Sequence, residues 1–67
     1  MEENINISII VPALNEEKNI ASAVRNISTA LSGRNDYEIL IFNDGSTDQT
    51  GEIADALASS SSRIRVI

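Results

Sequence analysis

The chain has 67 residues, close to the lower limit of what folds as an independent domain, so at most one domain is expected. Hydrophobic residues make up 42 % of it, which fits a globular core and argues against disorder. The chain has no cysteine and no histidine, which removes disulfides, thiolate metal sites and the commonest general base. A formal net charge of -5, with its basic residues scattered singly, argues against nucleic-acid binding.

The first predicted element is a strand over Ile5–Val11, whose continuous apolar character is typical of a strand buried on both faces in a parallel sheet. Pro12 is expected to end this strand because proline has no N–H to donate to a ladder. Asn15 is the predicted N-cap of the helix that follows. Glu16 and Glu17 would lie in its first turn, where the helix dipole favours negative charge.

Apolar residues at helical spacing predict an amphipathic helix of about four to five turns. The apolar stripe consists of Ile20, Ala23, Val24, Ile27, Ala30 and Leu31. Gly33 is well placed to end the helix in a left-handed conformation. A second strand is then predicted over Tyr37–Phe42, and the three turn-forming residues that follow it end it abruptly.

Ser46 and Gln49 are predicted to form a capping box at the start of a second, shorter helix, with Asp48 in its first turn. Gly51 weakens this helix by up to about 1 kcal/mol relative to alanine. The helix stripe consists of Ile53, Ala54, Leu57 and Ala58. A loop over Ser59–Ser62 and a third strand from Ile64 complete the chain.

The alternation of strands and helices predicts an α/β fold, a three-layer Rossmann-like β-α-β-α-β arrangement of parallel strands with right-handed crossovers. In such a sheet, ligands bind outside the carboxyl ends of the strands. The segments Pro12–Glu16 and Asn43–Ser46 each follow a predicted strand, so both are expected at the same sheet edge. Every polar candidate residue falls in one of these two segments.

The segment Asn43–Ser46 has two interpretations. It is a strand-to-helix turn whose residues suit the backbone geometry, or it carries a ligand contact. In the second interpretation, Asp44 accepts hydrogen bonds from a nucleobase N–H or a ribose hydroxyl, and Gly45 lets the ligand approach the backbone closely. The segment Pro12–Glu17 is likewise explained by a strand end and a helix start, except that a proline and a small residue lie at a ligand-facing edge. Of its two acids, Glu16 is expected to face inward.

Several other chemistries lack their sequence patterns. The phosphate loop GxxxxGK and the dinucleotide fingerprint GxGxxG are both absent. A serine nucleophile would have no histidine partner. Glu16 and Asp44 together resemble a glycosidase carboxylate pair only weakly, because the sequence does not set their separation.

The runs Ile9–Glu17 and Ile39–Asp48 together closely resemble the opening of family 2 glycosyltransferases with the GT-A fold. The resemblance covers nearly the whole chain, and the two blocks at a spacing of about thirty residues are specific in combination. It implies that residues 1–67 are a partial nucleotide-sugar-binding domain, the N-terminal half of a GT-A domain truncated at its third strand. It also implies a parent enzyme that transfers a sugar, with inversion, from a UDP-, GDP- or dTDP-sugar to a hydroxyl or a polyprenyl phosphate.

The resemblance assigns roles to individual residues. Pro12, Ala13 and Leu14 would line the base and ribose pocket. Glu16 would lie at its rim and either contact the nucleoside or order the neighbouring loop. Phe42 would flank the base through its backbone, and Asp44 would bind the nucleobase or ribose.

The sequence departs from the family pattern at two positions. Leu14 stands where an aromatic residue is common, so it offers apolar contact without stacking. Asn43 stands where many members have aspartate, and binding is therefore assigned to Asp44. The family's metal-binding Asp-x-Asp motif and catalytic base come further along, so no catalytic residue and no metal ligand is expected within these 67 residues. Mg or Mn is expected for the full-length protein only.

Two other classes stay open from the residues alone: a flavodoxin-like binding or regulatory module, and a structural fragment without a ligand. The acidic N-terminus resembles no targeting segment, so a cytoplasmic location, or the cytoplasmic face of a membrane, is expected. Membrane or polyprenyl contacts would come through the missing C-terminal part. The chain by itself is expected to be inactive and to oligomerise, which would cover its open sheet edges.

Overall fold

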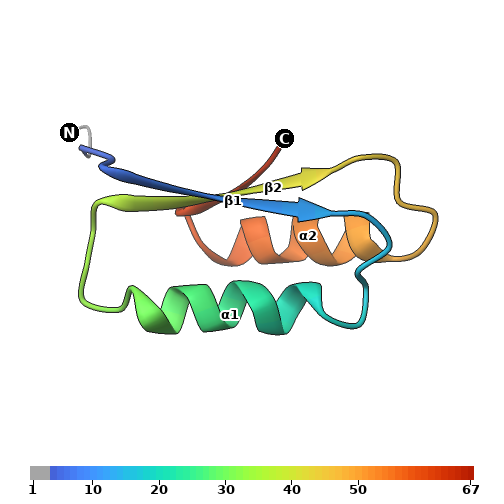
Figure 1. The fold of residues 1–67 in the computed structure, drawn as a ribbon, viewed down its shortest axis with the longest axis horizontal. Helices are drawn as coiled ribbons and strands as arrows, with labels where there is room; N and C mark the ends of the chain where they lie inside the picture. Colours follow the sequence, from blue (N-terminus) through green and yellow to red (C-terminus); the bar gives the residue numbers. More distant parts are fainter. Residues whose placement is uncertain (1–3) are drawn as a thin grey trace.

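The computed structural model describes residues 4–67. The elements in chain order are β1 (Ile7–Ala13), α1 (Ile20–Ala30), β2 (Tyr37–Asn43), α2 (Thr50–Ser60) and β3 (Ile64–Val66). The three strands form one parallel sheet in the order β1-β2-β3. The predicted β-α-β-α-β arrangement of parallel strands is therefore confirmed (Figure 1).

Both helices lie on the same face of the sheet (Figure 1). Right-handed crossovers that step in one direction across a parallel sheet place their helices on one side. The described residues thus build two layers, and they do not supply the third layer of the predicted arrangement. Side chains on the opposite sheet face are exposed: Ile10 is 55 % exposed and Phe42 is 40 % exposed. Burial of the first strand on both faces, as predicted, is not provided by residues 4–67.

Strands β1 and β2 pair in register along their whole length, from Ile7 opposite Tyr37 to Ala13 opposite Asn43. Ala13 and Asn43 are also the last residues of their strands. The chain therefore leaves both strands at the same level, and the two following loops emerge side by side at the carboxyl edge of the sheet (Figure 1).

The prediction that Pro12 ends the first strand is wrong. Pro12 lies within β1, opposite Phe42 of β2. Because β1 is an edge strand of the described sheet, it has a side without a neighbouring strand. Proline is tolerated in a strand where its missing N–H would have faced away from the partner.

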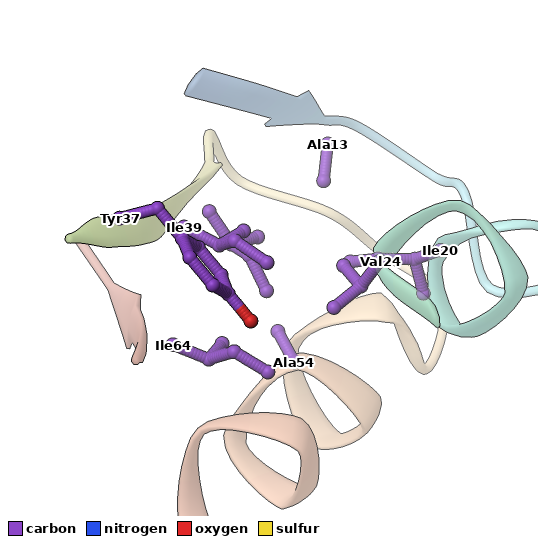
Figure 2. Close-up of a cluster of buried hydrophobic side chains, with 8 residues drawn as sticks. Ala13, Ile20, Val24, Tyr37, Ile39, Ala54 and Ile64 are labelled. Atoms are coloured by element: carbon purple, nitrogen blue, oxygen red, sulfur yellow. The ribbon is translucent and has the colours of Figure 1, made fainter. Parts of the chain in front are cut away.

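The hydrophobic core lies between the sheet and the two helices. Its buried members are Ala13, Ile20, Val24, Tyr37, Ile39, Ile41, Ala54 and Ile64. Figure 2 shows side chains from the sheet and from both helices converging on this space. Each fully buried isoleucine or valine contributes about 1.5–3 kcal/mol relative to an exposed one. This core holds the carboxyl ends of β1 and β2 beside the start of α2.

The connection from α1 to β2 contains the predicted helix-ending glycine. Gly33 has a φ of 89°, so its predicted left-handed conformation is confirmed, but α1 ends earlier, at Ala30, with Leu31 as its C-cap. Further along, Arg34 binds Asp36 through two hydrogen bonds of 2.9 and 2.8 Å. Asn6 donates a third hydrogen bond to the same carboxylate, at 3.0 Å. The hydrogen bonds from Arg34 and then Asn6 hold the pKa of Asp36 well below its ordinary value.

Candidate functional site

A pocket of about 630 Å³ lies at the carboxyl edge of the sheet. Its lining residues are Pro12, Ala13, Leu14, Glu16, Phe42, Asn43, Asp44 and Ile67. The pocket brings together the two segments that the sequence analysis placed at one edge. All but one of the predicted site residues line it, and the exception is Gly45.

The pocket combines apolar walls with exposed carboxylates. Leu14 is 55 % exposed and Phe42 is 40 % exposed, so each presents apolar surface that a flat ring could cover. Glu16 and Asp44 are both exposed and are the acidic residues of the pocket lining. A site of this kind offers hydrogen-bond acceptors to N–H and O–H donors beside an apolar contact surface.

Gly45 follows Asp44 directly and has a φ of 75°, in the left-handed region. An ideal Cβ placed on it would meet no atom within 4 Å. Its backbone conformation therefore requires glycine, because a side chain there would be strained although the space is open. The predicted close approach of a ligand to this backbone stays a prediction, since Gly45 does not line the pocket.

The prediction that Asn15 caps the first helix is wrong. Helix α1 begins at Ile20, and the structure gives its N-cap as Asn19. Asn15 instead has a φ of 54° and lies in the β1–α1 loop (residues 14–19). Its backbone N–H donates to Ser46 Oγ at 3.0 Å, and its Oδ1 accepts the Thr47 N–H at 2.8 Å. The asparagine thus joins two loops instead of starting a helix.

The predicted capping box of Ser46 and Gln49 is also wrong. Helix α2 begins later, at Thr50, and its N-cap residue Gln49 makes no side-chain capping hydrogen bond. Ser46 lies in the β2–α2 loop (residues 44–49), where its hydroxyl donates to Asn43 Oδ1 at 2.6 Å. At the start of the helix, Asp48 Oδ1 accepts the Thr50 N–H at 2.9 Å. Ser46 therefore makes contacts with the end of β2 and with the β1–α1 loop, and it does not cap a helix.

Thr50 connects the two loops that supply residues to the pocket. It is fully buried, at 0 % exposure, and its Oγ1 accepts the Glu16 N–H at 2.8 Å. The same hydroxyl donates to Asp48 Oδ1. The hydrogen bonds that Asp48 accepts, first that of the Thr50 hydroxyl, lower the pKa of Asp48 from its ordinary value. Two weaker contacts accompany them: Asp48 accepts the Glu17 N–H, and Glu17 accepts the Gln49 N–H, both at 3.3 Å.

Asn43 lines the pocket although binding was assigned only to its neighbour Asp44. Its side chain reaches α2, where its Nδ2 lies 2.9 Å from the position that a Cβ on Gly51 would occupy. Gly51 was predicted only to weaken the helix, but it also leaves space for this amide. Alternation along β2 could have revealed this, because Asn43 follows buried Ile39 and Ile41 on the same face of the strand.

The sequence analysis did not assign two further residues, one that lines the pocket and one that holds its loops. Ile67 lines the pocket from beyond β3, and its N–H donates to Ile41 O at 2.9 Å. Thr50 forms the contacts described above. Neither carries a sequence signal that separates it from ordinary helix and strand residues. Their roles come from contacts across the fold.

Within residues 4–67, no three histidine, cysteine, aspartate or glutamate side chains are grouped so that they could hold a metal ion. The acids of the pocket are thus not joined by a third ligand of this kind. In that same range, neither helix has the length and apolar character needed to cross a membrane.

The three parallel strands and their two helices form part of a Rossmann-like α/β domain, with a pocket at the carboxyl ends of the strands, where such sheets bind ligands. Comparison with known proteins identifies the family to which this domain belongs. Residues 8–67 match the domain described as glycosyl transferase family 2. The chain therefore belongs to the family 2 glycosyltransferases, as the resemblance of its two sequence blocks implied.

Named relatives agree with this assignment. The glycosyltransferase AglD of Haloferax volcanii is 36 % identical over 64 residues, which cover 91 % of this chain and 10 % of AglD. The uncharacterized glycosyltransferase EpsJ of Bacillus subtilis is 43 % identical over 61 residues, covering 91 % of the chain and 17 % of EpsJ. The dolichol-phosphate mannosyltransferase of Pyrococcus furiosus is 42 % identical over 53 residues, covering 79 % of the chain and 15 % of that enzyme. The chain spans a tenth to a fifth of the length of these and similar relatives.

Proposed function

We propose that the pocket binds the nucleoside of a UDP-, GDP- or dTDP-sugar, and that the chain is the N-terminal part of an inverting glycosyltransferase. The observation that carries this proposal is the convergence of two sequence blocks on one pocket. Pro12, Ala13, Leu14 and Glu16 come from the first block, and Phe42 and Asp44 from the second. Family membership supplies the reaction class, and the pocket supplies a place for the donor.

In the proposed binding mode, the base lies against the apolar surface of Leu14 and the strand ends that carry Pro12 and Phe42. Asp44 accepts a hydrogen bond from a base N–H or a ribose hydroxyl. A hydrogen bond to a charged group contributes more than one between neutral groups, which is why Asp44 is the strongest candidate for recognition. Glu16 lies at the same pocket and either contacts the nucleoside or orders its own loop.

In the proposed reaction of the full-length protein, an acceptor oxygen forms a bond to the anomeric carbon of the sugar as the bond to the nucleoside diphosphate breaks. A hydroxyl acceptor gives its proton to a base outside this chain, whereas a polyprenyl phosphate attacks as the anion. Attack opposite the leaving group inverts the configuration. The described residues contribute nucleoside binding alone, and this chain by itself is inactive.

Partners and cofactor belong to the same proposal. Mg²⁺ or Mn²⁺ is expected to act in the full-length protein through ligands outside residues 4–67. The acceptor is a hydroxyl or a polyprenyl phosphate, and the name of the Pyrococcus furiosus relative favours the second. The location is the cytoplasm or the cytoplasmic face of a membrane. The exposed side chains of Ile10 and Phe42 favour self-association of the isolated chain.

The test is a calorimetric titration of UDP-, GDP- and dTDP-glucose into the full-length protein, with and without Mn²⁺. One base class is expected to bind. Asp44→Ala is expected to weaken that binding about tenfold or more, because a charge-assisted hydrogen bond is lost. Asp55→Ala is the control, since Asp55 is an exposed acid on α2 outside the pocket. Absence of binding by all three nucleotides, or unchanged binding by the Asp44 variant, would contradict the proposal.

A further inference from the structure

Thr50 is the one buried polar residue among the described residues, and it lies at 0 % exposure between the two loops that form the pocket. A buried hydroxyl is retained at little cost only when its hydrogen bonds are satisfied. Thr50 meets that condition in both directions, because it accepts the Glu16 N–H and donates to Asp48 Oδ1. Its backbone N–H also donates to Asp48 Oδ1.

These contacts fix the β1–α1 loop to the start of a helix in the core. Glu16 lies 34 residues before Thr50 in sequence, so the contact is tertiary and not part of a local turn. The Glu16 carbonyl also accepts the N–H groups of Asn19 and Ile20, at 3.0 and 2.8 Å. The Glu16 peptide is therefore held from both sides, by Thr50 on one and by the first turn leading into α1 on the other.

The position of Glu16 matters because Leu14 and Glu16 line the pocket from the β1–α1 loop. Asp44 lies on the other loop, which Thr50 reaches through Asp48. The loops that carry both walls of the pocket are thus held, directly or through Asp48, by one buried hydroxyl on α2. Thr50 itself does not line the pocket and cannot contact a ligand there.

We propose that Thr50 is a positioning residue for nucleotide-sugar binding, which sets the distance between the pocket wall of Leu14 and Glu16 and the wall of Asp44. The proposal rests on the proposed function of the pocket. It assigns to Thr50 a role that acts through the Glu16 N–H and the Asp48 carboxylate. Without the hydroxyl, the β1–α1 loop loses its fixed point, and the donor must order the loop when it binds.

The experiment compares Thr50→Val and Thr50→Ser in the full-length protein. Valine keeps the shape of the side chain but leaves the Glu16 N–H without its acceptor, whereas serine keeps the hydroxyl. Val24→Ala is the matched control, because Val24 is a buried residue of α1 outside the pocket and its truncation destabilises the fold generally. Thr50→Ala, which places no methyl group against the Glu16 N–H, replaces the valine variant if that variant does not fold.

The first measurement is hydrogen–deuterium exchange of residues 14–19 in the absence of nucleotide. The second is the Kd for the nucleotide sugar that the wild type binds. The valine variant is expected to exchange faster in this segment and to bind the donor about tenfold more weakly. The serine variant and the Val24 control are expected to keep both properties within about threefold.

Unchanged affinity in the valine variant would overturn the positioning role. Equal losses of affinity in the valine variant and the Val24 control would overturn it too, because general destabilisation would then explain both. A wild type that binds no nucleotide sugar overturns the proposed function instead. The exchange measurement then decides by itself whether Thr50 fixes the β1–α1 loop.

Discussion

Replacing Gly51 with alanine sets two effects of opposite sign against each other. Alanine favours the helix and restricts the unfolded chain, which stabilises a protein by about 0.4–1 kcal/mol at a compatible position. At this position, the new Cβ would lie 2.9 Å from Asn43 Nδ2. Ordinary contact begins at 3.4 Å, so the amide must move by about 0.5 Å.

Asn43 cannot move freely because its Oδ1 is engaged. It accepts the Ser46 hydroxyl at 2.6 Å and the Ser46 N–H at 3.4 Å. Loss of these hydrogen bonds costs about 1–2 kcal/mol, of which the shorter one carries the larger part. Gly51→Ala is therefore expected to destabilise the protein by about 0.5 kcal/mol, against the sign that helix propensity alone gives.

A double-mutant cycle isolates this contact. In an Asn43→Ala background the amide is gone, so Gly51→Ala is expected to stabilise the protein by about 0.5–1 kcal/mol. The coupling energy between the two positions is then about 1–1.5 kcal/mol. Urea unfolding of the four proteins measures it. If Gly51→Ala changes the unfolding free energy equally in both backgrounds, the inference that Gly51 makes room for Asn43 is refuted.

Two predictions concern the connection between α1 and β2. The pKa of Asp36 is lowered in the folded protein, so its contribution to stability is fully present above the ordinary aspartate pKa of about 3.9 and is lost as the pH falls below it. Asp36→Asn is expected to make the unfolding free energy fall less steeply between about pH 5 and pH 2, as measured by urea unfolding, and an unchanged slope would contradict this. Gly33→Ala is expected to cost about 1 kcal/mol, because alanine is strained at a φ of 89° although no atom lies within 4 Å of its Cβ. A thermal midpoint as high as that of the wild type would show that the backbone here adapts without strain.

The order and type of the five elements could be predicted from the sequence. Isoleucine-rich runs and a helical apolar stripe are local signals, and the structure places strands and helices where these signals lie. The left-handed conformation of Gly33 was also predictable, because glycine needs no distant partner to adopt a positive φ. Six of the seven predicted site residues line one pocket, since the carboxyl ends of parallel strands meet at one edge. Their binding roles stay predictions.

The boundaries at the site could not be read in the same way. Asn15 and Ser46 have side chains that suit a helix start, and each was assigned to one. In the structure their hydrogen bonds go to each other's loops, across 31 residues of sequence, and both helices begin later. Pro12 was expected to end a strand, yet it remains in β1 because that strand is at the edge of the described sheet. A capping prediction from local sequence fails where a residue far away in the chain supplies the hydrogen bond that the side chain needs.

The sequence by itself determined the elements, their order and the edge at which the two site segments meet, because hydrophobic period and turn chemistry act over a few residues. Only the tertiary structure decided how the site is held together. Thr50 accepts the Glu16 N–H, and Gly51 leaves space for the Asn43 amide, through contacts between segments far apart in the chain. Such contacts exist only after the sheet has brought the strand ends together, since a hydrogen bond requires its partners to lie within about 3 Å.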